Sequence, residues 1–593
     1  MTARGLHGRR SLLGAALAGC ALIALATAPS ALAHAQLVGT SPAAGSTVAT
    51  QPAQVIFRFN QNVGGTAGAV RVYNARGEEV DDLDVSHPDG DERKMGVGLK
   101  RRLPDGTYTA TYRVVSADTH IVYGGLVFSI GHRGAAPRYT VAGLIGRNET
   151  GRVTKVAFGV VRVLDYLSIA LMIGGLVFLY AVWGPALESL ARPEPRWSQA
   201  SDAFTRRAAR MLAVAVVIGI SVSLLGVLLQ GATAAGVSLW SSLKGTVIEG
   251  TLESRFGWVW AVRALDWALL GALLAWARRA GPRGVRVSRP PAWVAVGLTI
   301  GCAYLVTTLA LAGHASIQSP TAVFFPSETL HVLAASLWVG GIACLLLVLP
   351  AATRRLEGAE RTRLLFGSLR RFSPLALAAV VAIAATGVTQ AYIDVRSLHG
   401  LLHTTYGALI IAKTALLCSL IALGWMNRER LIPALQRISE AAGEPGGVGV
   451  LARRTLRGEL ILMLCVFGVT AALVTYAPPI DAASGPFSTS TTIGPAVLEM
   501  TVEPAKVGPN TIHLYLIDAR TGAQYTAIKE LTATAKLPAK DIGPLPLRAS
   551  PAGPGHYILS SAVLSPGGTW AIEIVDRVSE FEQFTRVVKV PIS

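Results

Sequence analysis

The sequence predicts a mixed fold: an exported all-β domain, a bundle of eight transmembrane helices and a second exported all-β domain. Three observations predict it. First, 51% of the 593 residues are hydrophobic and only 15% are charged, which is too apolar for a chain of soluble domains. Second, eight apolar segments are each long enough to cross a bilayer, which takes about 20 residues. Third, short stretches before and after them alternate apolar and polar residues, as β-strands do.

The formal net charge is +18, and its distribution decides its meaning. The arginines fall in short runs between long apolar segments, such as RRAGPRGVRVSR from Arg278. Cytoplasmic loops of membrane proteins have this pattern. The charge therefore indicates an orientation in the membrane and argues against a nucleic-acid partner.

Residues 1–33 are expected to be a secretory signal peptide. Arginines near the N-terminus precede an apolar run from Ser11 to about Thr27, and the small-residue triplet Ala31-Leu32-Ala33 follows. This pattern predicts cleavage before His34. An alternative is the string LAGC, which resembles a lipobox and would acylate Cys20, leaving His34 internal. The apolar run continues past Cys20, which favours cleavage before His34.

The first β domain is predicted at residues 34–133. Strand-like segments, among them VIFRFNQNV, GTYTATYRVVSAD and GLVFSIG, are separated by Gly, Asn and Pro-Asp-Gly turns. About one hundred residues of short strands predict a small sandwich or barrel. A linker rich in Gly and Arg is expected at 134–154.

The membrane domain is predicted at residues 155–477. Its eight spans are expected at about 155–183, 209–234, 257–277, 291–313, 327–350, 373–393, 405–426 and 456–477. The loops after spans one, three, five and seven carry dense arginine, whereas the loop after span four, GHASIQSPTAVFFP, has no charged residue. By the positive-inside rule the arginine-rich loops are cytoplasmic. Both termini are then extracytoplasmic, and the plasma (inner) membrane is the expected location.

Residues 478–495 predict a linker rich in Pro, Ser and Thr, and residues 496–593 predict the second β domain. Segments such as TIHLYLIDA, TWAIEIVD and TRVVKVPI alternate apolar and polar residues and are separated by turns such as SPGG. Six or seven short strands again predict a sandwich.

The membrane domain contains an internal repeat. LDYLSIALMIGGLV from Leu164 and LHVLAASLWVGGIA from Leu330 align without gaps. The alignment places Asp165 against His331 and a glycine pair against a glycine pair. It predicts a four-plus-four duplication whose halves are related by a pseudo-twofold axis along the membrane normal. Sites between the halves become the natural place for function.

Charged residues inside the spans follow the same repeat. Arg263 parallels Lys413, each six positions past its glycine. Arg162 with Asp165, and Arg263 with Asp266, stand three positions apart, which predicts ion pairs within each helix. These pairs are interpreted as structural.

Three residues of the first β domain suggest a metal site. Cleavage before His34 gives this residue a free α-amine beside its imidazole, so that one residue offers two nitrogens. Asp118 and His120 are two apart and face the same side of an extended segment. Three nitrogens with a carboxylate or water suit Cu(II). Met95 is the only methionine of the domain, which disfavours a Cu(I) thioether site.

The first β domain resembles the copper-resistance protein CopC through HAQLVGTSPAAGSTV and LPDGTYTATYRVVSADTHIVYGGLVFSIG. The membrane part resembles CopD, so residues 34 to 477 are similar to the fused CopC–CopD copper proteins of bacteria. The resemblance implies a cupredoxin-like or Ig-like β-barrel with a histidine-brace Cu(II) site at His34, Asp118 and His120. Thr119 and Ile121 stand where the family usually has Gly and Pro. The tail resembles small Ig-like domains appended to such fusions, and no metal residue carries over there.

Two histidines of the membrane domain are candidates for a second copper site. His314 ends span four at its outer side and His331 lies about one turn into span five. Polar residues within a bilayer are costly, which makes them functional candidates. The alternatives are an interfacial role for His314 and a hydrogen bond to a neighbouring helix for His331. His399 and His403, in the next outer loop, are interpreted as solvated.

Together these features predict a non-enzymatic membrane protein of copper homeostasis or resistance. It would capture Cu(II) outside and pass copper to the membrane domain, with import favoured because the binding domain is exported. No ATP-binding or phosphorylation motif is found. Copper ions and membrane lipid are the expected partners, and an exported copper chaperone or reductase is a candidate one. The main alternative is a haem- or copper-dependent membrane electron-transfer protein, with His314 and His331 as axial ligands. A second is a copper monooxygenase.

Overall fold

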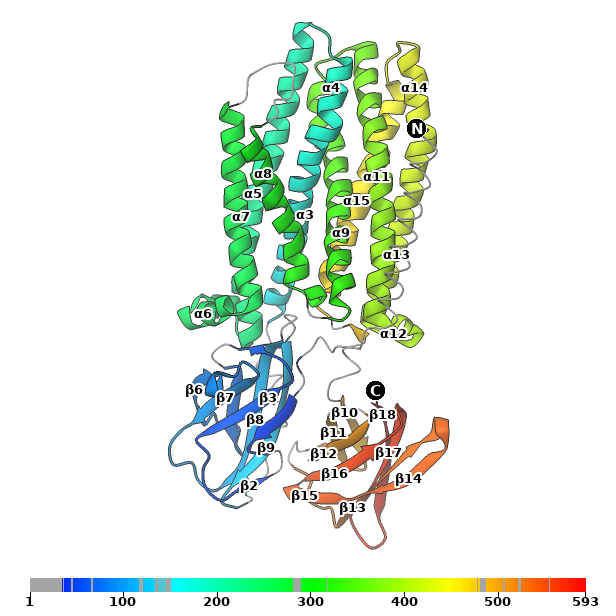
Figure 1. The fold of residues 1–593 in the computed structure, drawn as a ribbon. Coiled ribbons are helices and arrows are strands. Elements are labelled where there is room, and N and C mark those ends of the chain that lie inside the picture. The colour runs from blue at the N-terminus through cyan, green and yellow to red at the C-terminus, as the bar shows by residue number, and fades with distance from the viewer. Residues whose placement is uncertain are drawn as a thin grey trace, which may run out of the picture. The chain divides into compact units, whose positions relative to one another are not determined.

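The computed structural model describes residues 35–132, 151–280, 290–316, 318–476 and 487–592, apart from short internal gaps such as 117–120, and a few isolated residues between these ranges. The expected signal peptide and the candidate ligands His34, Asp118 and His120 lie outside the described residues. The chain forms two compact units (Figure 1). One contains 152–230 and 255–477, and the other contains 32–151, 231–254 and 478–593.

The first β domain is built from two sheets. One has the order β1-β3-β7-β6, and the other has the order β2-β9-β8-β4 with β5 also paired to β8. All strand pairs are antiparallel except β2 with β9. The strands are β1 Leu37–Ser41, β2 Thr47–Val48, β3 Gln54–Phe59, β4 Val63–Gly64, β5 Val70–Asn74, β6 Asp81–Ser86, β7 Lys94–Leu99, β8 Gly106–Ser116 and β9 Ile121–Ile130.

Alternation along the strands produces the core of this domain. In β3, Val55, Phe57 and Phe59 are buried while Arg58 between them is exposed. The rings of Phe57 and Phe59 pack on Tyr112 of β8, with centroids 4.9 and 5.2 Å apart. Aromatic pairs at such distances stabilise a core beyond the effect of their burial. The predicted small β domain is confirmed.

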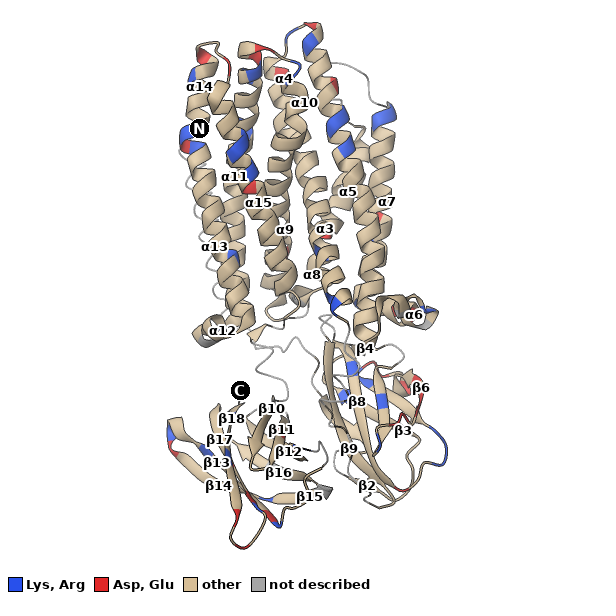
Figure 2. Ribbon diagram, turned by 180° about the vertical axis from the view of Figure 1, so that it is seen from behind, with Lys and Arg blue, Asp and Glu red and all other residues tan. Residues whose placement is uncertain are grey.

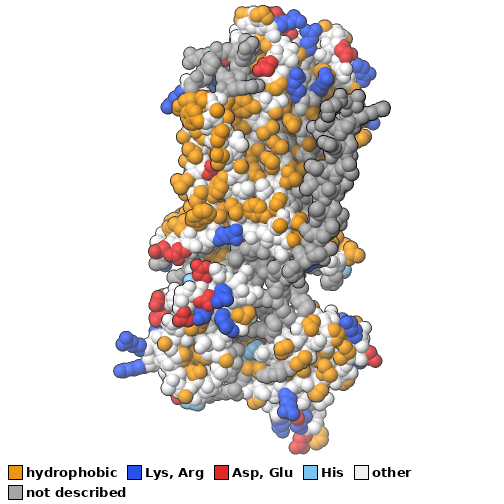
Figure 3. Space-filling model, in the orientation of Figure 1, with side chains coloured by type: hydrophobic (Ala, Val, Ile, Leu, Met, Phe, Trp, Pro, Cys, Tyr) orange, Lys and Arg blue, Asp and Glu red, His pale blue; other side chains and the backbone are white. Residues whose placement is uncertain are grey.

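Eight of the described helices are long and apolar enough to cross a membrane, which confirms the predicted spans. Hydrophobic side chains cover the helical unit in Figure 3, and Lys and Arg gather at the end that carries α4 and α14 in Figure 2. The long helices are α3 Arg152–Val177, α5 Pro195–Ala235, α7 Arg255–Ala280, α8 Ala292–Leu311, α9 Thr321–Ala343, α11 Gly358–Val395, α13 Thr405–Met426 and α15 Gly446–Leu473. The short ones are α4 Gly184–Leu190, α6 Gly245–Glu253, α10 Leu349–Thr353, α12 Leu398–His403 and α14 Ile432–Glu440.

Two helices begin well before the spans expected from hydropathy. Helix α5 begins at Pro195 and α11 at Gly358, whereas their apolar segments begin near 209 and 373. The additional turns contain arginines, which are good helix formers but do not belong in hydrocarbon. Hydropathy therefore located the membrane part of each helix and missed its polar extension.

The first helix of each half crosses the other at a glycine. A Cβ at Gly174 of α3 would lie 2.6 Å from the Cα of Gly340 of α9, and a Cβ at Gly340 would lie 2.7 Å from the Cα of Gly174. Each added Cβ would also collide with a carbonyl of the other helix, from Ser336 and Ala170 respectively. Ala170 and Ser336 are equivalent in the repeat, so the contact is reciprocal. Reciprocal contacts are the mark of a twofold relation, and they support the predicted duplication.

The same two helices each contain a π-helical turn. These turns span Phe178–Trp183 after α3 and Cys344–Val348 after α9. Their first residues are 166 positions apart, as are Gly174 and Gly340. A proline follows each turn, Pro185 in α4 and Pro350 in α10. Proline lacks an N–H and its ring clashes with the preceding turn of an α-helix, so a widened turn relieves the conflict.

The second β domain is a sandwich of a five-stranded sheet, β10-β11-β12-β16-β15, and a four-stranded sheet, β14-β13-β17-β18. Its core lies between the sheets and includes Trp570, Ile572 and Ile574, alternate residues of β17. The predicted all-β domain is confirmed. The strands are β10 Phe487–Ile493, β11 Ala496–Glu503, β12 Gly508–Asp518, β13 Glu530–Leu537, β14 Ile542–Leu547, β15 Ala549–Gly553, β16 His556–Leu564, β17 Gly568–Arg577 and β18 Gln583–Ile592.

Candidate functional site

One end of the first β domain joins two segments that are far apart in sequence. The backbone N–H of Ala35 donates to Ser116 Oγ at 2.9 Å, across 81 positions. The side chain of Gln61 donates to the same oxygen at 2.8 Å. Ala35 directly follows His34 and is buried. Ser116 is the last residue of β8 and stands two positions before Asp118.

The segment that carries the other candidate ligands lies between two strands that pair with each other. Strands β8 and β9 form an antiparallel hairpin in which Val115 pairs with Ile121. Residues 117–120, which include Asp118 and His120, therefore connect two paired strands. Ala35, which follows His34, and Ser116, which ends β8 just before residues 117–120, therefore lie at the same end of the domain.

Other possible donors of this domain are engaged elsewhere. Met95 is buried in the core and packs there. His132 is exposed, with Nδ1 3.3 Å from a carboxylate oxygen of Asp105. Among the described residues of the whole chain, no three His, Cys, Asp or Glu side chains are grouped so as to hold a metal ion.

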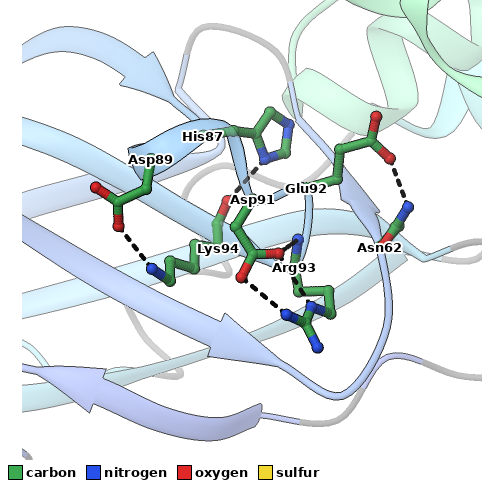
Figure 4. Close-up of polar contacts among 7 residues, drawn as sticks. All are labelled: Asn62, His87, Asp89, Asp91, Glu92, Arg93 and Lys94. Atoms are coloured by element: carbon green, nitrogen blue, oxygen red, sulfur yellow. Dashed lines mark hydrogen bonds and ion pairs between the residues drawn. The ribbon is translucent and has the colours of Figure 1, made fainter.

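The loop between β6 and β7 holds the remaining histidine of the domain (Figure 4). The Nδ1 atom of His87 is 2.7 Å from the carbonyl oxygen of Lys94. Hydrogen bonds between polar side chains stabilise the same loop. One of them, from the Arg93 side chain, lowers the pKa of Asp91. These pairs are Lys94 with Asp89, Arg93 with Asp91, and Asn62 with Glu92. The set is a local loop network, separate from the Ala35–Ser116 end.

The helical unit contains a fully buried ion pair. Arg263 Nη1 of α7 donates to Asp165 Oδ2 of α3 at 2.6 Å, and both side chains are inaccessible to solvent. The predicted pairs within each helix are wrong. Arg162 instead lies over the ring of Phe158 at 4.1 Å, and Asp266 Oδ2 has no hydrogen-bond partner among the described residues. Spacing of three positions shows that two side chains share a helix face, but not which neighbouring helix that face meets.

His331 of α9 is oriented by a hydroxyl group of the neighbouring helix α11. Its Nδ1 lies 2.9 Å from Thr386 Oγ1. The Thr386 hydroxyl itself lies 2.6 Å from the carbonyl oxygen of Ala382, which can only accept. The hydroxyl proton therefore goes to Ala382, and Thr386 Oγ1 accepts from His331 Nδ1–H. This tautomer leaves a lone pair on His331 Nε2, the state that a metal ligand requires.

The other candidate of the membrane site is placed only by its backbone. His314 begins a 3₁₀ turn, His314–Ser316, which follows α8 and packs against α9. The side chain of His314 lies outside the described residues. The side chain of His403 is exposed at the end of α12.

Two residues near His331 were missed by sequence reasoning. Glu328 lies three positions before His331 on α9, and Thr386 belongs to a different helix. Lys413, the repeat counterpart of Arg263, acts electrostatically on both His331 and Glu328. The acidic residue on the same helix face was a usable signal, whereas the Thr386 contact depends on helix packing.

Comparison with known proteins matches the chain in three segments. Residues 37–131 match the CopC domain, 153–322 match the copper resistance protein D-like N-terminal domain, and 366–473 match copper resistance protein D. The copper transport protein CutJ of Bacillus subtilis is 29% identical over 507 residues, which are 85% of this chain and 85% of that protein.

Two further relatives correspond to the separate parts. Copper resistance protein D of Pseudomonas syringae pv. tomato is 27% identical over 54% of this chain and 99% of its own length. Copper resistance protein C of the same organism is 34% identical over 21% of this chain and 98% of its own length. The chain therefore belongs to the copper-resistance family, with a CopC domain and CopD domains fused in one polypeptide.

Proposed function

We propose that this protein captures Cu(II) outside the cell and passes copper inward through its membrane domain. The names of its relatives, which include a copper transport protein and copper resistance proteins, support copper as the cargo. The hydrogen bond from Ala35 N to Ser116 Oγ is the observation that carries the proposal. It supports a capture site because it ties the residue after His34 to the strand that leads to Asp118 and His120.

The capture site is a histidine brace. His34 supplies its α-amine and its imidazole, and His120 supplies a third nitrogen. Asp118 supplies an oxygen. Nitrogen and oxygen donors in a tetragonal set suit Cu(II). The hairpin and the Ala35 hydrogen bond hold the ligands from both ends, which reduces the conformational entropy that the site loses when the metal binds.

The membrane step begins at His331, with His314 as its proposed partner. The Thr386 hydroxyl orients the imidazole and leaves Nε2 as the donor atom. A histidine oriented through its other nitrogen is the usual arrangement of a metal ligand. The C-terminal half would thus hold the copper, while the equivalent position of the N-terminal half holds the Asp165–Arg263 ion pair.

The direction of transport follows from orientation. The arginine-rich loops are on the cytoplasmic side by the positive-inside rule, which places both β domains outside. A binding domain outside can serve as an entrance for the metal. No ATP-binding motif is found in the sequence, so movement would be passive, driven by the membrane potential or coupled to reduction of copper.

The test combines the mature N-terminus with copper accumulation. Mass spectrometry of the purified protein should find His34 as the first residue, and cells that carry the protein should accumulate labelled copper faster than cells that lack it. The His34→Ala and His331→Ala variants should lose this gain, whereas His132→Gln should keep it. An acylated Cys20 would contradict the brace, and loss of copper from the cells would contradict import.

A further inference from the structure

The C-terminal β domain brings together two histidines that are 43 positions apart. His513 lies on β12 and His556 on β16, and His513 Nδ1 is 3.3 Å from His556 Nε2. Both side chains are buried. Nothing in the family resemblance or in the proposed capture and transport route uses them.

The strand register explains why the two rings meet. In the antiparallel pair of β12 and β16, Tyr515 stands opposite His556 and His513 stands opposite Ile558. His513 and His556 are therefore diagonal neighbours on one face of the sheet, within reach of long side chains. The other face of β12 presents Leu514 and its apolar neighbours to the core.

Tyr515 fixes the orientation of this pair. Its ring lies parallel to that of His556, with centroids 4.2 Å apart and an angle of 11° between the planes. The two histidine rings are also nearly parallel, at 21°, with centroids 5.6 Å apart. Nearly parallel rings with two nitrogens facing each other restrict the rotation of both imidazoles.

The chemistry of the pair suits a metal ligand set. Burial lowers the pKa of His513 to about 4, so this imidazole is neutral at physiological pH and has one nitrogen lone pair available to a metal. Burying polar rings also costs free energy that apolar residues at the same positions would not cost. If this face of the sheet had only a structural role, apolar side chains at these two positions would stabilise the domain more.

The distance between the nitrogens fits a shared ion. Two metal–nitrogen bonds of about 2.0 Å span about 2.8 Å at the angle of about 90° of a tetragonal site and about 3.3 Å at a tetrahedral angle. One Cu(II) ion would therefore draw the two nitrogens together by about 0.5 Å or accept a distorted angle. We propose that His513 and His556 form a second copper site in the C-terminal domain, independent of the histidine brace. Copper is the metal because imidazole nitrogens bind it well and the chain belongs to a copper-resistance family.

Binding requires one proton to move within the site. In the free pair one of the facing nitrogens carries the hydrogen of the hydrogen bond. When the ion enters, that hydrogen moves to the other nitrogen of the same ring, so both facing nitrogens coordinate and no net proton is released. Because no third His, Cys, Asp or Glu of the described residues joins the group, water or an exchanging ligand completes the coordination. Such a site can release copper to a partner.

The experiment uses the full-length protein in detergent, loaded with copper(II) sulfate and desalted. Copper per chain is measured by mass spectrometry of the element, and the number of coordinated imidazoles by pulsed electron paramagnetic resonance. The variants are His513→Gln, His556→Gln and the double variant, with the exposed His132→Gln as the matched control. Hydrogen exchange of β12 and β16 reports whether the domain is folded.

Each single variant should lose about one copper equivalent, and the double variant should lose no more than either single one, because both side chains hold the same ion. The control should keep its copper. The same loss should occur in a His34→Ala background, which separates this site from the brace. Unchanged copper in folded single variants would overturn the site and leave the two histidines as a hydrogen-bonded pair.

Discussion

Gly174 and Gly340 occupy the same position in the two halves of the membrane domain and contact each other. The absence of a Cβ at both positions lets α3 and α9 approach to backbone contact. Close approach of helices through small residues is a main source of stability inside a bilayer, where apolar surface gains nothing from leaving lipid.

The Gly340→Ala substitution should destabilise the membrane domain because its Cβ would meet the backbone of α3. Overpacking of this kind costs about 1–3 kcal/mol. Thermal unfolding in detergent measures the effect. The control is Gly424→Ala on α13, where an added Cβ meets nothing within 4 Å. There alanine should be neutral or slightly stabilising, and equal losses at both positions would refute the close contact.

The Arg263→Met substitution should be more damaging than the removal of a surface charge. It leaves Asp165 buried without its partner, and breaking a buried pair typically costs about 3–5 kcal/mol. Adding Asp165→Asn should recover part of the loss. The matched control is Arg206→Gln, whose partner Asp202 is 4.0 Å away at an exposed site. Its effect on the melting temperature should be small, since exposed pairs contribute about 0–1 kcal/mol.

The Ser116→Ala substitution should weaken Cu(II) binding about fivefold, because the hydrogen bond that holds the chain beside His34 is worth about 1 kcal/mol. Competition titration of the full-length protein with a copper chelator measures the affinity. Ser46→Ala is the control, since that hydroxyl donates to Ala43 O, three positions away in the same turn. His34→Ala should cost several orders of magnitude. If the Ser116→Ala variant binds copper as tightly as the unaltered protein, the hydrogen bond between Ala35 and Ser116 does not hold the copper ligands in place.

The Thr386→Val substitution should reduce copper accumulation while leaving copper capture by the exported domain unchanged. Valine keeps the shape of threonine but removes the acceptor that orients His331, and such changes typically cost about 10–100-fold in metal affinity. Uptake of labelled copper by cells measures the effect. Thr389→Val is the control because its hydroxyl bonds to Ala385 O on the same helix. Similar uptake in both variants would show that the contact of Thr386 with His331 is not needed for copper transport.

Asp576 makes the C-terminal domain sensitive to pH. Its side chain is buried on the core-facing side of β17, and burial raises the pKa of Asp576 to about 6. An unfolded aspartate has a pKa of about 3.9, so the folded state binds the extra proton between these values. The free energy of unfolding therefore falls as pH rises from about 4 to above 6.

The Asp576→Asn substitution should accordingly stabilise the domain at pH 7.5 and have little effect at pH 4. Hydrogen exchange of β17 in the full-length protein measures the difference at the two pH values. Glu573→Gln, on the exposed face of the same strand, provides the control and should show no such dependence. A stabilisation by Asp576→Asn that is equal at both pH values would contradict the burial effect.

The sequence predicted the parts of this structure that depend on local pattern. Apolar length revealed the eight spans, and alternation revealed both β domains. The gapless alignment of two helices revealed the repeat that joins Gly174 to Gly340. Each of these signals lies within one segment, so it can be read without knowing which segments are neighbours.

The contacts that sequence reasoning missed depend on which segments become neighbours. Arg263 pairs with Asp165 on another helix, although Asp266 is only three positions away. His513 meets His556 because of a strand register that no local pattern specifies. The proposed brace ligands lie outside the described residues, so their assignment remains a prediction from the sequence, supported by the Ala35–Ser116 hydrogen bond.

The two π-helical turns explain how the duplicated helices came to differ in length. The first turn has six residues and the second has five, and the prolines that follow are 165 positions apart (185 to 350) rather than 166. A single insertion or deletion is thus absorbed inside one widened turn. The length of the helix can change there without displacing the glycine crossing on one side or the arginine-rich loop on the other.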